Sequence, residues 1–334
     1  MALTNTILAG DIGGTKTLLG LFTCNNHRPE PLVITRYSTQ DYEDARTILR
    51  DFICKHAHDT NINAATLGVA GPVRNTSCDL TNIPWRIDST TISDVLNIDL
   101  PNIQLINDVE AMAYAIPVLG SDEVTTLQEG NADPQGNAVL IAPGTGLGAS
   151  VLIKLNNRFI SIAGELGHTD YAPRTPKEIL FLKTIIKQFG RASYEHVLSG
   201  RGLSLLHIFT HDAKPCELFN NTDAPRADDI TAAAIGNKCS RCASALDMFT
   251  STLGSESGNL ALRSLATAGV YIGGGIAPKL LDRLRSNTFL DAFRAKAPME
   301  HILSDIPIHV VLSENLALLG AAVVSSQLIS RVHN

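Results

Sequence analysis

The sequence predicts an α/β fold built from two related lobes. Short apolar segments typical of strands alternate with amphipathic segments typical of helices, which favours this fold class. A strand, a glycine-rich turn and a second strand occur at Ile7–Phe22 and again at Asn137–Ile153, about 130 residues later. Because no long polar linker separates the two halves, we expect helices to join the lobes, with a cleft between them.

The first lobe begins with the strands and the turn of Ile7–Phe22. An amphipathic helix is expected later because Ile48, Phe52 and Ile53 share one face of it. Gly71-Pro72 ends the strand that follows this helix. The expected elements are a strand near Leu32–Tyr37, a helix at about Tyr42–Ala57, a strand at Ala65–Ala70, a short helix at Ser89–Leu96, a strand at Ile103–Ile106 and a helix at Val109–Leu119.

The second lobe repeats the opening pattern and adds a third strand near Arg158–Ile162. Thr175 and Pro176 have the residue types of an N-cap and a first helical position, and Gly190 is placed to end that helix. Helices are expected up to about Ala266, with an interruption near Gly254–Gly258. The last elements are a strand at Gly269–Ile272, a helix from about Ala277, a strand at Ile308–Leu312 and a helix from about Asn315. We expect residues 1–115 with 315–334 to form a small α/β domain, and residues 116–314 a large one.

Composition excludes several classes of function. An apolar content of 44% over 334 residues is enough to build a full core. The formal net charge of -6, without any long run of like charges, argues against a nucleic-acid partner. The N-terminus lacks the basic and apolar regions of a secretory signal, and no apolar run approaches the roughly 18 residues of a membrane span. We therefore expect a cytoplasmic protein without a membrane partner.

The cysteines are expected to be reduced thiols, as is usual in the cytoplasm. Cys239 and Cys242 have the spacing of half a zinc site, but no second pair of ligands appears nearby in the sequence. We therefore expect these two cysteines to pack as small hydrophobic side chains on a helix. The six cysteines are Cys24, Cys54, Cys78, Cys216, Cys239 and Cys242.

The two glycine-rich turns have the residue types of a phosphate site. Glycine lets backbone N–H groups approach an anion, and Thr15 and Lys16 add a hydroxyl and a charge. Asp11 would repel phosphate unless Mg²⁺ lies between them, held through water. Two plain β-hairpins with glycine turns are the alternative. The candidate residues are Gly10, Asp11, Gly13, Gly14, Thr15 and Lys16 in the first lobe, and Gly144, Thr145 and Gly146 in the second.

These turns are not typical of two common nucleotide motifs. The first turn is followed by a strand rather than a helix, which disfavours a dinucleotide-binding fold. The sequence also lacks a match to the GxxxxGK[ST] phosphate loop.

Six segments, in chain order, together resemble bacterial glucokinases. The resemblance covers essentially the whole chain, from Gly10 to the C-terminal helix. It implies a two-lobed actin-like, ribonuclease H-like ATPase fold, with ATP and glucose as substrates, Mg²⁺ as cofactor and a homodimer as the expected assembly. The segments are GDIGGTKT, INDVEAMAYAIP, APGTGLGA, AGELGH, EHVLSGRGL and YIGGGIAPKLL.

The pair Asn107-Asp108 is the candidate centre of the sugar site. It follows a strand, and ligands of open α/β sheets lie at the carboxyl ends of strands. Asp108 is the candidate general base, and Asn107 can both donate to and accept from a sugar hydroxyl. The alternative from local sequence is an N-cap for the next helix, which can coexist with catalysis.

The resemblance also implies the remaining contacts. The residues expected to contact glucose are Glu165, His168 and Glu195, together with Asn82 in the loop before Trp85. Gly274 and Gly275 are expected to let adenosine approach the backbone closely, with Gly258 and Asn259 beside it.

Three other functions remain open from the sequence. A kinase for another hexose or an N-acetylhexosamine would share the nucleotide site but not the sugar pocket. A non-catalytic sugar-sensing regulator and an actin-like ATPase would share the fold. The related repressor/kinase branch carries a cysteine-rich zinc motif, which is missing after Gly167-His168. ATP as donor is implied by the family alone, because ADP and polyphosphate kinases share these turns.

Overall fold

The computed structural model describes residues 5–24, 28–58, 60–156, 158–162, 164–219 and 225–332. The outermost residues of the expected small domain, 1–4 and 333–334, lie outside the described residues. The chain divides into unit 1, made of Met1–Gly120, Phe159–Ala163 and Asn315–Asn334, and unit 2, made of Ser121–Arg158 and Gly164–Glu314. Residues 116–120 and 159–163, which the sequence places in the large domain, are grouped with unit 1.

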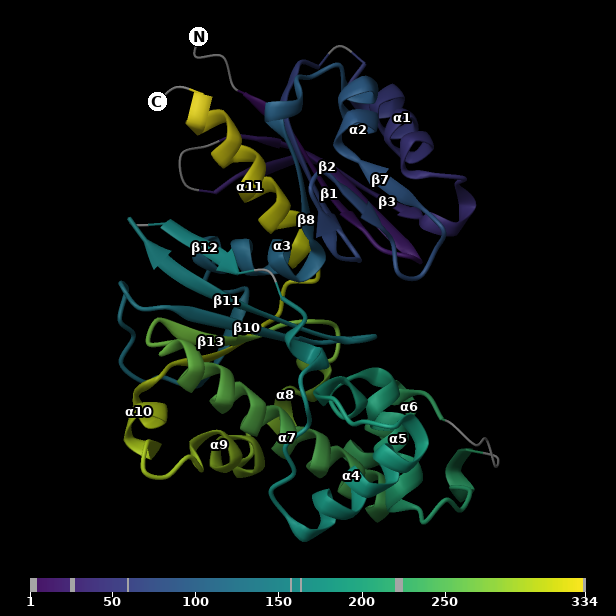
Figure 1. The fold of residues 1–334 in the computed structure, drawn as a ribbon, viewed down its shortest axis with the longest axis vertical. Coiled ribbons are helices and arrows are strands. Elements are labelled where there is room, and N and C mark those ends of the chain that lie inside the picture. Colours follow the sequence, from purple (N-terminus) through teal and green to yellow (C-terminus); the bar gives the residue numbers. More distant parts are fainter. Residues whose placement is uncertain are drawn as a thin grey trace. The chain divides into compact units, whose positions relative to one another are not determined.

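Unit 1 contains a five-stranded sheet with the order β3-β2-β1-β4-β8. Strands β1, β2 and β3 form an antiparallel meander, whereas β4 and β8 run parallel to β1 (Figure 1). The strands are β1 (Thr6–Ile12), β2 (Lys16–Thr23), β3 (Glu30–Ser38), β4 (Ile62–Val69) and β8 (Ile103–Asn107); a small separate sheet contains β5 (Val73–Arg74), β6 (Ser77–Asp79) and β7 (Arg86–Asp88).

Helices cover both faces of this sheet. Successive residues of a strand point to opposite faces, so Leu8 and Ile12 pack with α1 (Ala45–His56) and α2 (Ser89–Leu96). On the other face, Ile7 packs with α11 (Leu316–Val332), which also contacts α3 (Asp108–Ala115). The sheet is therefore buried on both sides, as expected of an α/β fold.

A six-stranded sheet that belongs mainly to unit 2 repeats this arrangement, with the order β12-β11-β10-β13-β14-β9. Strands β10 to β12 form a meander, β13 and β14 run parallel to β10, and β9 is antiparallel to β14 at the edge. This common strand order confirms the predicted α/β class and the two related halves. The strands are β9 (Val124–Gln128), β10 (Ala138–Pro143), β11 (Leu147–Leu155), β12 (Arg158–Ile162), β13 (Gly269–Ile272) and β14 (Ile308–Val311).

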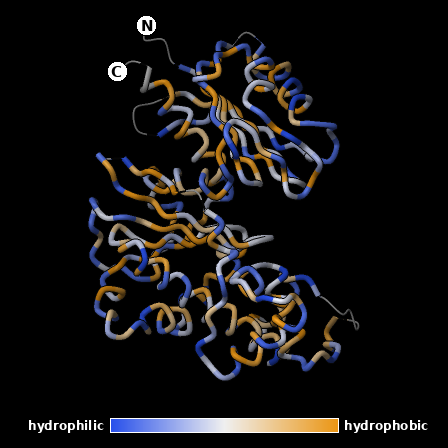
Figure 2. Tube along the Cα trace, in the orientation of Figure 1, coloured by the Kyte–Doolittle hydropathy of each residue, from blue (hydrophilic) through white to orange (hydrophobic). Residues whose placement is uncertain are grey.

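The helices of unit 2 pack around the long helix α7. Helix α4 begins as predicted, with the Thr175 hydroxyl accepting the Glu178 N–H at 3.2 Å, and ends at Gly190 in the left-handed conformation. In Figure 2 the hydrophobic colour gathers along the central strands, and the hydrophilic colour lies mainly on loops and outer helix faces. The helices are α4 (Pro176–Phe189), α5 (Gly200–Thr210), α6 (Ala227–Ile235), α7 (Ser240–Ser264), α8 (Leu281–Leu284), α9 (Asn287–Arg294) and α10 (Glu300–Asp305).

Short 3₁₀ helices complete the structure. One of them, Ala277–Leu280, comes immediately before α8, so the helix expected from Ala277 begins with this tighter geometry. The others are Thr39–Asp41, Leu100–Asn102, Ile116–Val118, Leu166–His168, Tyr194–His196 and Glu217–Phe219. Among the described residues, none of the helices combines the length and apolar character of a membrane span.

The expected interruption of α7 near Gly254–Gly258 is wrong. The helix runs unbroken from Ser240 to Ser264. A Cβ on Gly254 would lie 2.2 Å from the carbonyl oxygen of Phe289, and one on Gly258 would lie 2.5 Å from that of Phe293. These glycines therefore allow α9 to pack closely against α7, and tertiary packing offsets their low helix propensity.

Candidate active site

Two acidic residues lie at the carboxyl edge of the unit 1 sheet. Asp11 is next to the last residue of β1, and Asn107 ends β8, with Asp108 directly after it. Strands β1, β4 and β8 are parallel, and their register pairs Asp11 with Gly68 and Val69 with Asn107. The sheet therefore brings the predicted general base to the same edge as the predicted metal ligand.

The electrostatics of Asp11 confirm this proximity. Burial, then the negative charge of Asp108, raises the pKa of the Asp11 carboxyl from 3.8 to about 6, although Lys16 acts in the opposite direction. Gly68 was missed from the sequence. A Cβ there would lie 3.1 Å from the Ala111 Cβ, so glycine lets α3 begin close to β4.

Asn107 caps α3, which confirms the alternative interpretation of this residue. Its Oδ1 accepts the Val109 N–H at 2.9 Å, and its Nδ2 donates to the Gly71 carbonyl at 3.2 Å. Asp108 Oδ1 also accepts the Val109 N–H at 2.9 Å. A carboxylate has two oxygens, so this hydrogen bond is compatible with proton transfer at the other. These hydrogen bonds fix the orientation of both side chains.

The first glycine-rich turn is closed by a hydrogen bond from the Gly13 N–H to the Lys16 carbonyl, 3.0 Å long. A Cβ on Gly14 would lie 2.8 Å from the Asn82 Cβ, so the structure brings the predicted phosphate turn and Asn82 together. Gly10 differs from the turn residues. It lies within β1, and a Cβ there would lie 2.4 Å from the Leu67 side chain, so core packing accounts for this glycine.

In unit 2, the second glycine-rich turn lies against Glu195. The Glu195 Oε2 accepts the Leu147 N–H at 3.0 Å, and a Cβ on Gly146 would lie 2.6 Å from the same oxygen. A Cβ on Gly167 would lie 2.0 Å from the Leu147 carbonyl oxygen, so the segment that carries His168 also packs closely here. Glu195, expected in the sugar site, therefore also supports the turn expected to bind phosphate.

Glu165 and His168 lie at the two ends of this packed segment. The Glu165 Oε2 is 4.0 Å from the His168 Nε2, and both side chains are more than half exposed. Three of the five predicted contacts to glucose thus lie on segments that pack around Leu147.

A pocket of about 550 Å³ lies within unit 2 beside the second glycine-rich turn. Gly144, Thr145 and Gly275 were predicted from the sequence, and most of the lining was missed. Gly200 and Arg201 belong to the EHVLSGRGL segment, so that segment was the available signal for them. The other missed lining residues are Ser204, Pro225, Arg226, Ala227, Asp228, Ile276 and Lys279.

The pocket walls come from the first turns of α5 and α6 and from the turn after β13. Backbone N–H groups at helix N-termini favour anionic ligands. Lys279 Nζ lies 2.7 Å from Asp228 Oδ1, which fixes a charged pair at the wall. Gly274 does not line the pocket; it has a φ of +77°, and a Cβ would lie 2.5 Å from the Pro143 carbonyl oxygen. Gly274 therefore shapes the turn that presents Gly275.

Gly258 and Asn259, expected beside adenosine, do not line this pocket. Gly258 faces α9, as described above. The Asn259 Nδ2 donates to Tyr194 Oη at 3.1 Å and to Glu256 Oε2 at 2.7 Å. Both positions are explained by packing within unit 2, and their place beside adenosine stays a prediction.

Cys242 is buried in the core on α7, as expected, but the fold brings candidate ligands from distant segments beside it. His207, His211 and Cys216 lie beside Cys242, and the four ligand atoms are within 4.8 Å of one another. Burial, then the neighbouring His211, lowers the pKa of His207 to about 4. The residues come from α5 and the loop after it, so the spacing of the cysteine pair alone did not reveal them. The available signal was the i, i+4 spacing of the two histidines.

Comparison with known proteins identifies the family. A glucokinase family model matches residues 8–328. The chain belongs to the glucokinase family. It is 34% identical to the glucokinase of Nostoc sp. PCC 7120, over 96% of this chain and 99% of that protein. It is 35% identical to the glucokinase of Yersinia pestis, over 96% of both chains. The resemblance and the expected kinase activity are thereby confirmed.

Solved structures show the same two-lobed fold. A glucokinase from an Antarctic psychrotroph is 28% identical, with a TM-score of 0.84 over 97% of this chain and 99% of that one. The glucokinase of Balamuthia mandrillaris, solved in complex with glucose, is 22% identical, with a TM-score of 0.75 over 97% and 94% of the two chains. A ROK family glucokinase from Streptomyces griseus, solved with glucose and AMPPNP, is 19% identical, with a TM-score of 0.67 over 97% and 100%.

Proposed function

We propose that this member of the glucokinase family transfers the γ-phosphoryl group of ATP to the 6-hydroxyl of glucose, forming glucose 6-phosphate and ADP. The observation that carries the proposal is the position of Asp108 beside Asp11 at the carboxyl edge of the unit 1 sheet. Ligands of open α/β sheets bind at this edge, and phosphoryl transfer needs a positioned base and a charge-neutralising group there.

Asp108 takes the proton of the attacking hydroxyl in this proposal. General-base catalysis of this kind contributes about 10²–10⁴-fold to the rate. The hydrogen bonds at the start of α3 hold Asp108 and Asn107 in place, which reduces the cost of orienting them during the reaction. The residues proposed to bind glucose are Asn107, Asn82, Glu165, His168 and Glu195.

The pocket in unit 2 is proposed to hold the adenosine of ATP. Its volume is within the usual range for small-molecule sites. Gly275 leaves space for a ligand, because no atom lies within 4 Å of the position that a Cβ on this residue would take. Glycine turns at residues 13–16 and 144–146 are proposed to contact the phosphates. The relative solved with glucose and AMPPNP supports a ternary mechanism.

Mg²⁺ is proposed to bind at Asp11, through water. The residues fit a cation, because burial and the adjacent Asp108 carboxylate raise the pKa of Asp11, and a divalent ion would relieve the repulsion between the two carboxylates. When bound, Mg²⁺ would neutralise phosphate charge. We further propose that the protein is a cytoplasmic homodimer without membrane or nucleic-acid partners.

A coupled assay of ADP release tests the reaction. Glucose, mannose, fructose and N-acetylglucosamine are compared as acceptors, and ATP, ADP and polyphosphate as donors, with glucose 6-phosphate measured directly where ADP is not a product. We expect the highest kcat/KM with glucose and ATP. A higher value with another sugar would favour a kinase for that sugar, and ADP release that ignores every sugar would favour an ATPase.

The variant Asp108→Asn tests the base. We expect kcat to fall by at least about 100-fold while calorimetric glucose binding largely survives, because the amide keeps the shape and loses the base. Asp94→Asn is the matched control, since Asp94 is exposed on α2 in the same unit. Near-normal turnover of Asp108→Asn would end the assignment of Asp108 as base.

A further inference from the structure

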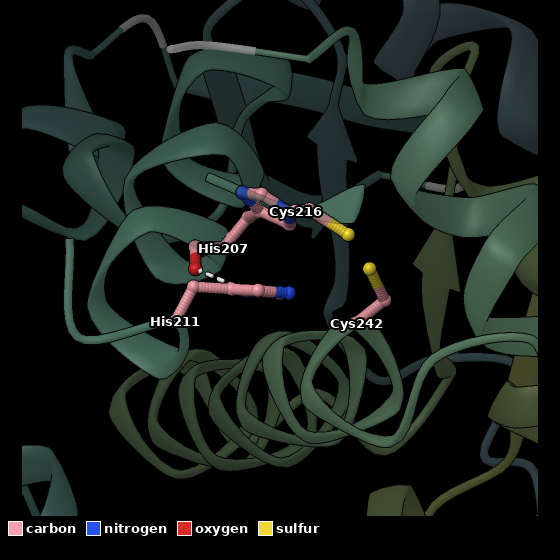
Figure 3. Close-up of side chains that lie close together, drawn as sticks. All are labelled: His207, His211, Cys216 and Cys242. Carbon is pink, nitrogen blue, oxygen red and sulfur yellow. Dashed lines mark hydrogen bonds between the residues drawn. The ribbon is translucent and has the colours of Figure 1, made fainter. Parts of the chain in front are cut away.

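Unit 2 contains a buried group of two imidazoles and two thiols that the kinase reaction does not use. His207 lies on α5, His211 directly follows that helix, Cys216 lies in the next loop and Cys242 is in the first turn of α7 (Figure 3). Each of the four residues is at most 5% exposed. Their ligand atoms lie within 4.8 Å of one another.

The side chains point toward a common space. In Figure 3 the sulfurs of Cys216 and Cys242 point toward one another, and the His211 ring points toward the same region. The two histidines lie four positions apart in sequence, which places them on one side of the helix, and their ring centroids are 3.9 Å apart. Residues from three segments of the chain thus converge on one space.

One histidine is already oriented as a ligand would be. The His211 Nδ1 lies 2.8 Å from the His207 backbone carbonyl, shown by the dashed line in Figure 3. A carbonyl only accepts, so Nδ1 carries the proton and Nε2 presents its lone pair. This arrangement, in which the second ring nitrogen donates to a backbone carbonyl, is typical of metal-binding histidines.

The other histidine supplies an independent observation. Both ring nitrogens of His207 are buried, and neither has a hydrogen-bond partner among the described residues. A buried polar group without a partner destabilises a fold. A metal ion bound at one nitrogen would give this imidazole the partner that the protein does not.

We propose that His207, His211, Cys216 and Cys242 bind one Zn²⁺ ion in a tetrahedral structural site. Two thiolates and two imidazoles are a common ligand set for zinc, whose bonds to sulfur and nitrogen are about 2.3 and 2.0–2.1 Å long. Ligand atoms of such a site lie about 3–4 Å apart, so the group closes around the ion with small side-chain movements. The charge also balances: each thiol releases a proton, and two thiolates neutralise the 2+ ion in a buried setting.

Cys239 borders the proposed site. Its sulfur accepts the Cys242 backbone N–H at 3.5 Å and lies 3.5 Å from the His211 Nε2. As the N-cap of α7, Cys239 orients the turn that carries Cys242. The ion would join the end of α5 to the start of α7. Because α5 begins at the proposed nucleotide pocket, the site would stabilise the helix that forms one wall of that pocket.

Metal analysis of the full chain tests the proposal. Protein purified from zinc-supplemented medium, under reducing conditions and without chelators, is expected to hold about one zinc per chain by mass spectrometry. Cys216→Ser and Cys242→Ser should reduce the zinc content at least tenfold. Cys54→Ser is the matched control, because Cys54 is an exposed cysteine on α1 and should leave the content unchanged.

Cobalt binding to the unaltered chain keeps the test decisive if these variants fold poorly. After zinc is removed by a chelator, Co²⁺ should produce the visible absorption of a tetrahedral ion and a thiolate-to-metal charge-transfer band. Added Zn²⁺ should abolish both signals and raise the Tm. Reduced protein that binds neither ion, or that shows only octahedral cobalt, would overturn the proposal, as would a disulfide between Cys216 and Cys242 in protein kept under reducing conditions.

Discussion

The carboxylate of Asp11 is held in an environment that disfavours its charge. Burial and the neighbouring Asp108 raise its pKa from 3.8 to about 6, so the folded chain binds a proton more tightly than the unfolded chain. Below about pH 4 both states are protonated and Asp11 has no effect on stability. As pH rises through the window from 3.8 to about 6, the fold loses stability, and above it the loss is complete.

The variant Asp11→Asn tests this cost. A shift of about two pKa units corresponds to about 3 kcal/mol of stability. Without Mg²⁺, the free energy of unfolding of wild type should therefore fall by up to this amount between about pH 4 and pH 7. The fall is measured relative to Asp11→Asn, which lacks the titrating group. Urea unfolding across this range measures it, with Asp94→Asn as control. A difference that does not change with pH would contradict the prediction. Added Mg²⁺ should stabilise wild type at pH 7 and leave Asp11→Asn unchanged.

Several proposed ligand residues also have structural roles. Asn107 caps α3, and Glu195 accepts the Leu147 N–H beside the second glycine-rich turn. Such hydrogen bonds set a side chain in position before any ligand binds, which lowers the entropy lost on binding. The alternative of cap or ligand, open from the sequence, is therefore not exclusive at Asn107.

Helix α7 shows how packing overrides local propensity. Alanine is a better helix former than glycine by about 1 kcal/mol, so Gly254→Ala and Gly258→Ala would stabilise an isolated helix. In the folded chain each new methyl group meets a carbonyl oxygen of α9, and we expect a net loss of about 1–3 kcal/mol. Thermal or urea unfolding measures the change, and Ser240→Ala, at an exposed position of α7, is the control. Unchanged or increased stability would show that α9 moves away at little cost.

Elements with strong local signals could be predicted from the sequence. Helix α4 has an N-cap, a first-turn proline and a terminal glycine, and the structure places it at Pro176–Phe189. The two glycine turns and the polar pair Asn107-Asp108 at the end of β8 could also be predicted, because each is marked by its own short sequence motif. Contacts between distant segments were not visible. The close approach of α9 to Gly254 and the meeting of His207 with Cys242 both depend on how helices pack, which no single segment encodes.

At the scale of the whole chain, the two units share a strand order yet contribute different groups to the proposed reaction: unit 1 the base and the metal ligand, and unit 2 the adenosine pocket. The shared order is a meander followed by two parallel strands, but the candidate site residues lie at only one pair of equivalent strands. In unit 1 they are Asp11 near the end of β1 and Asp108 after β8, and in unit 2 the glycine turns after β10 and β13. Only β1 and β10 are equivalent strands in the two sheets. The division into a small domain of residues 1–115 with 315–334 and a large domain of residues 116–314 stays a prediction.

Hydrogen exchange with separate ligands tests this division of roles between the units. Adenosine should slow hydrogen exchange at the residues that line the unit 2 pocket, including Gly200–Ser204 and Gly275–Lys279. It should leave the exchange rates of α1 and α2 unchanged. Glucose should instead slow exchange at the start of α3. A ligand at about 100 times its Kd stabilises the binding-competent state by about 2.7 kcal/mol, which is ample for detection.

The variant Gly275→Val provides the matched control for the exchange experiment. No atom lies within 4 Å of a Cβ at Gly275, so the fold should be retained while the new side chain occupies the pocket. Adenosine protection should then be lost, and the effect of glucose on α3 should persist. Equal protection by adenosine in wild type and Gly275→Val would show that the nucleoside binds elsewhere, even if the chain remains an active kinase.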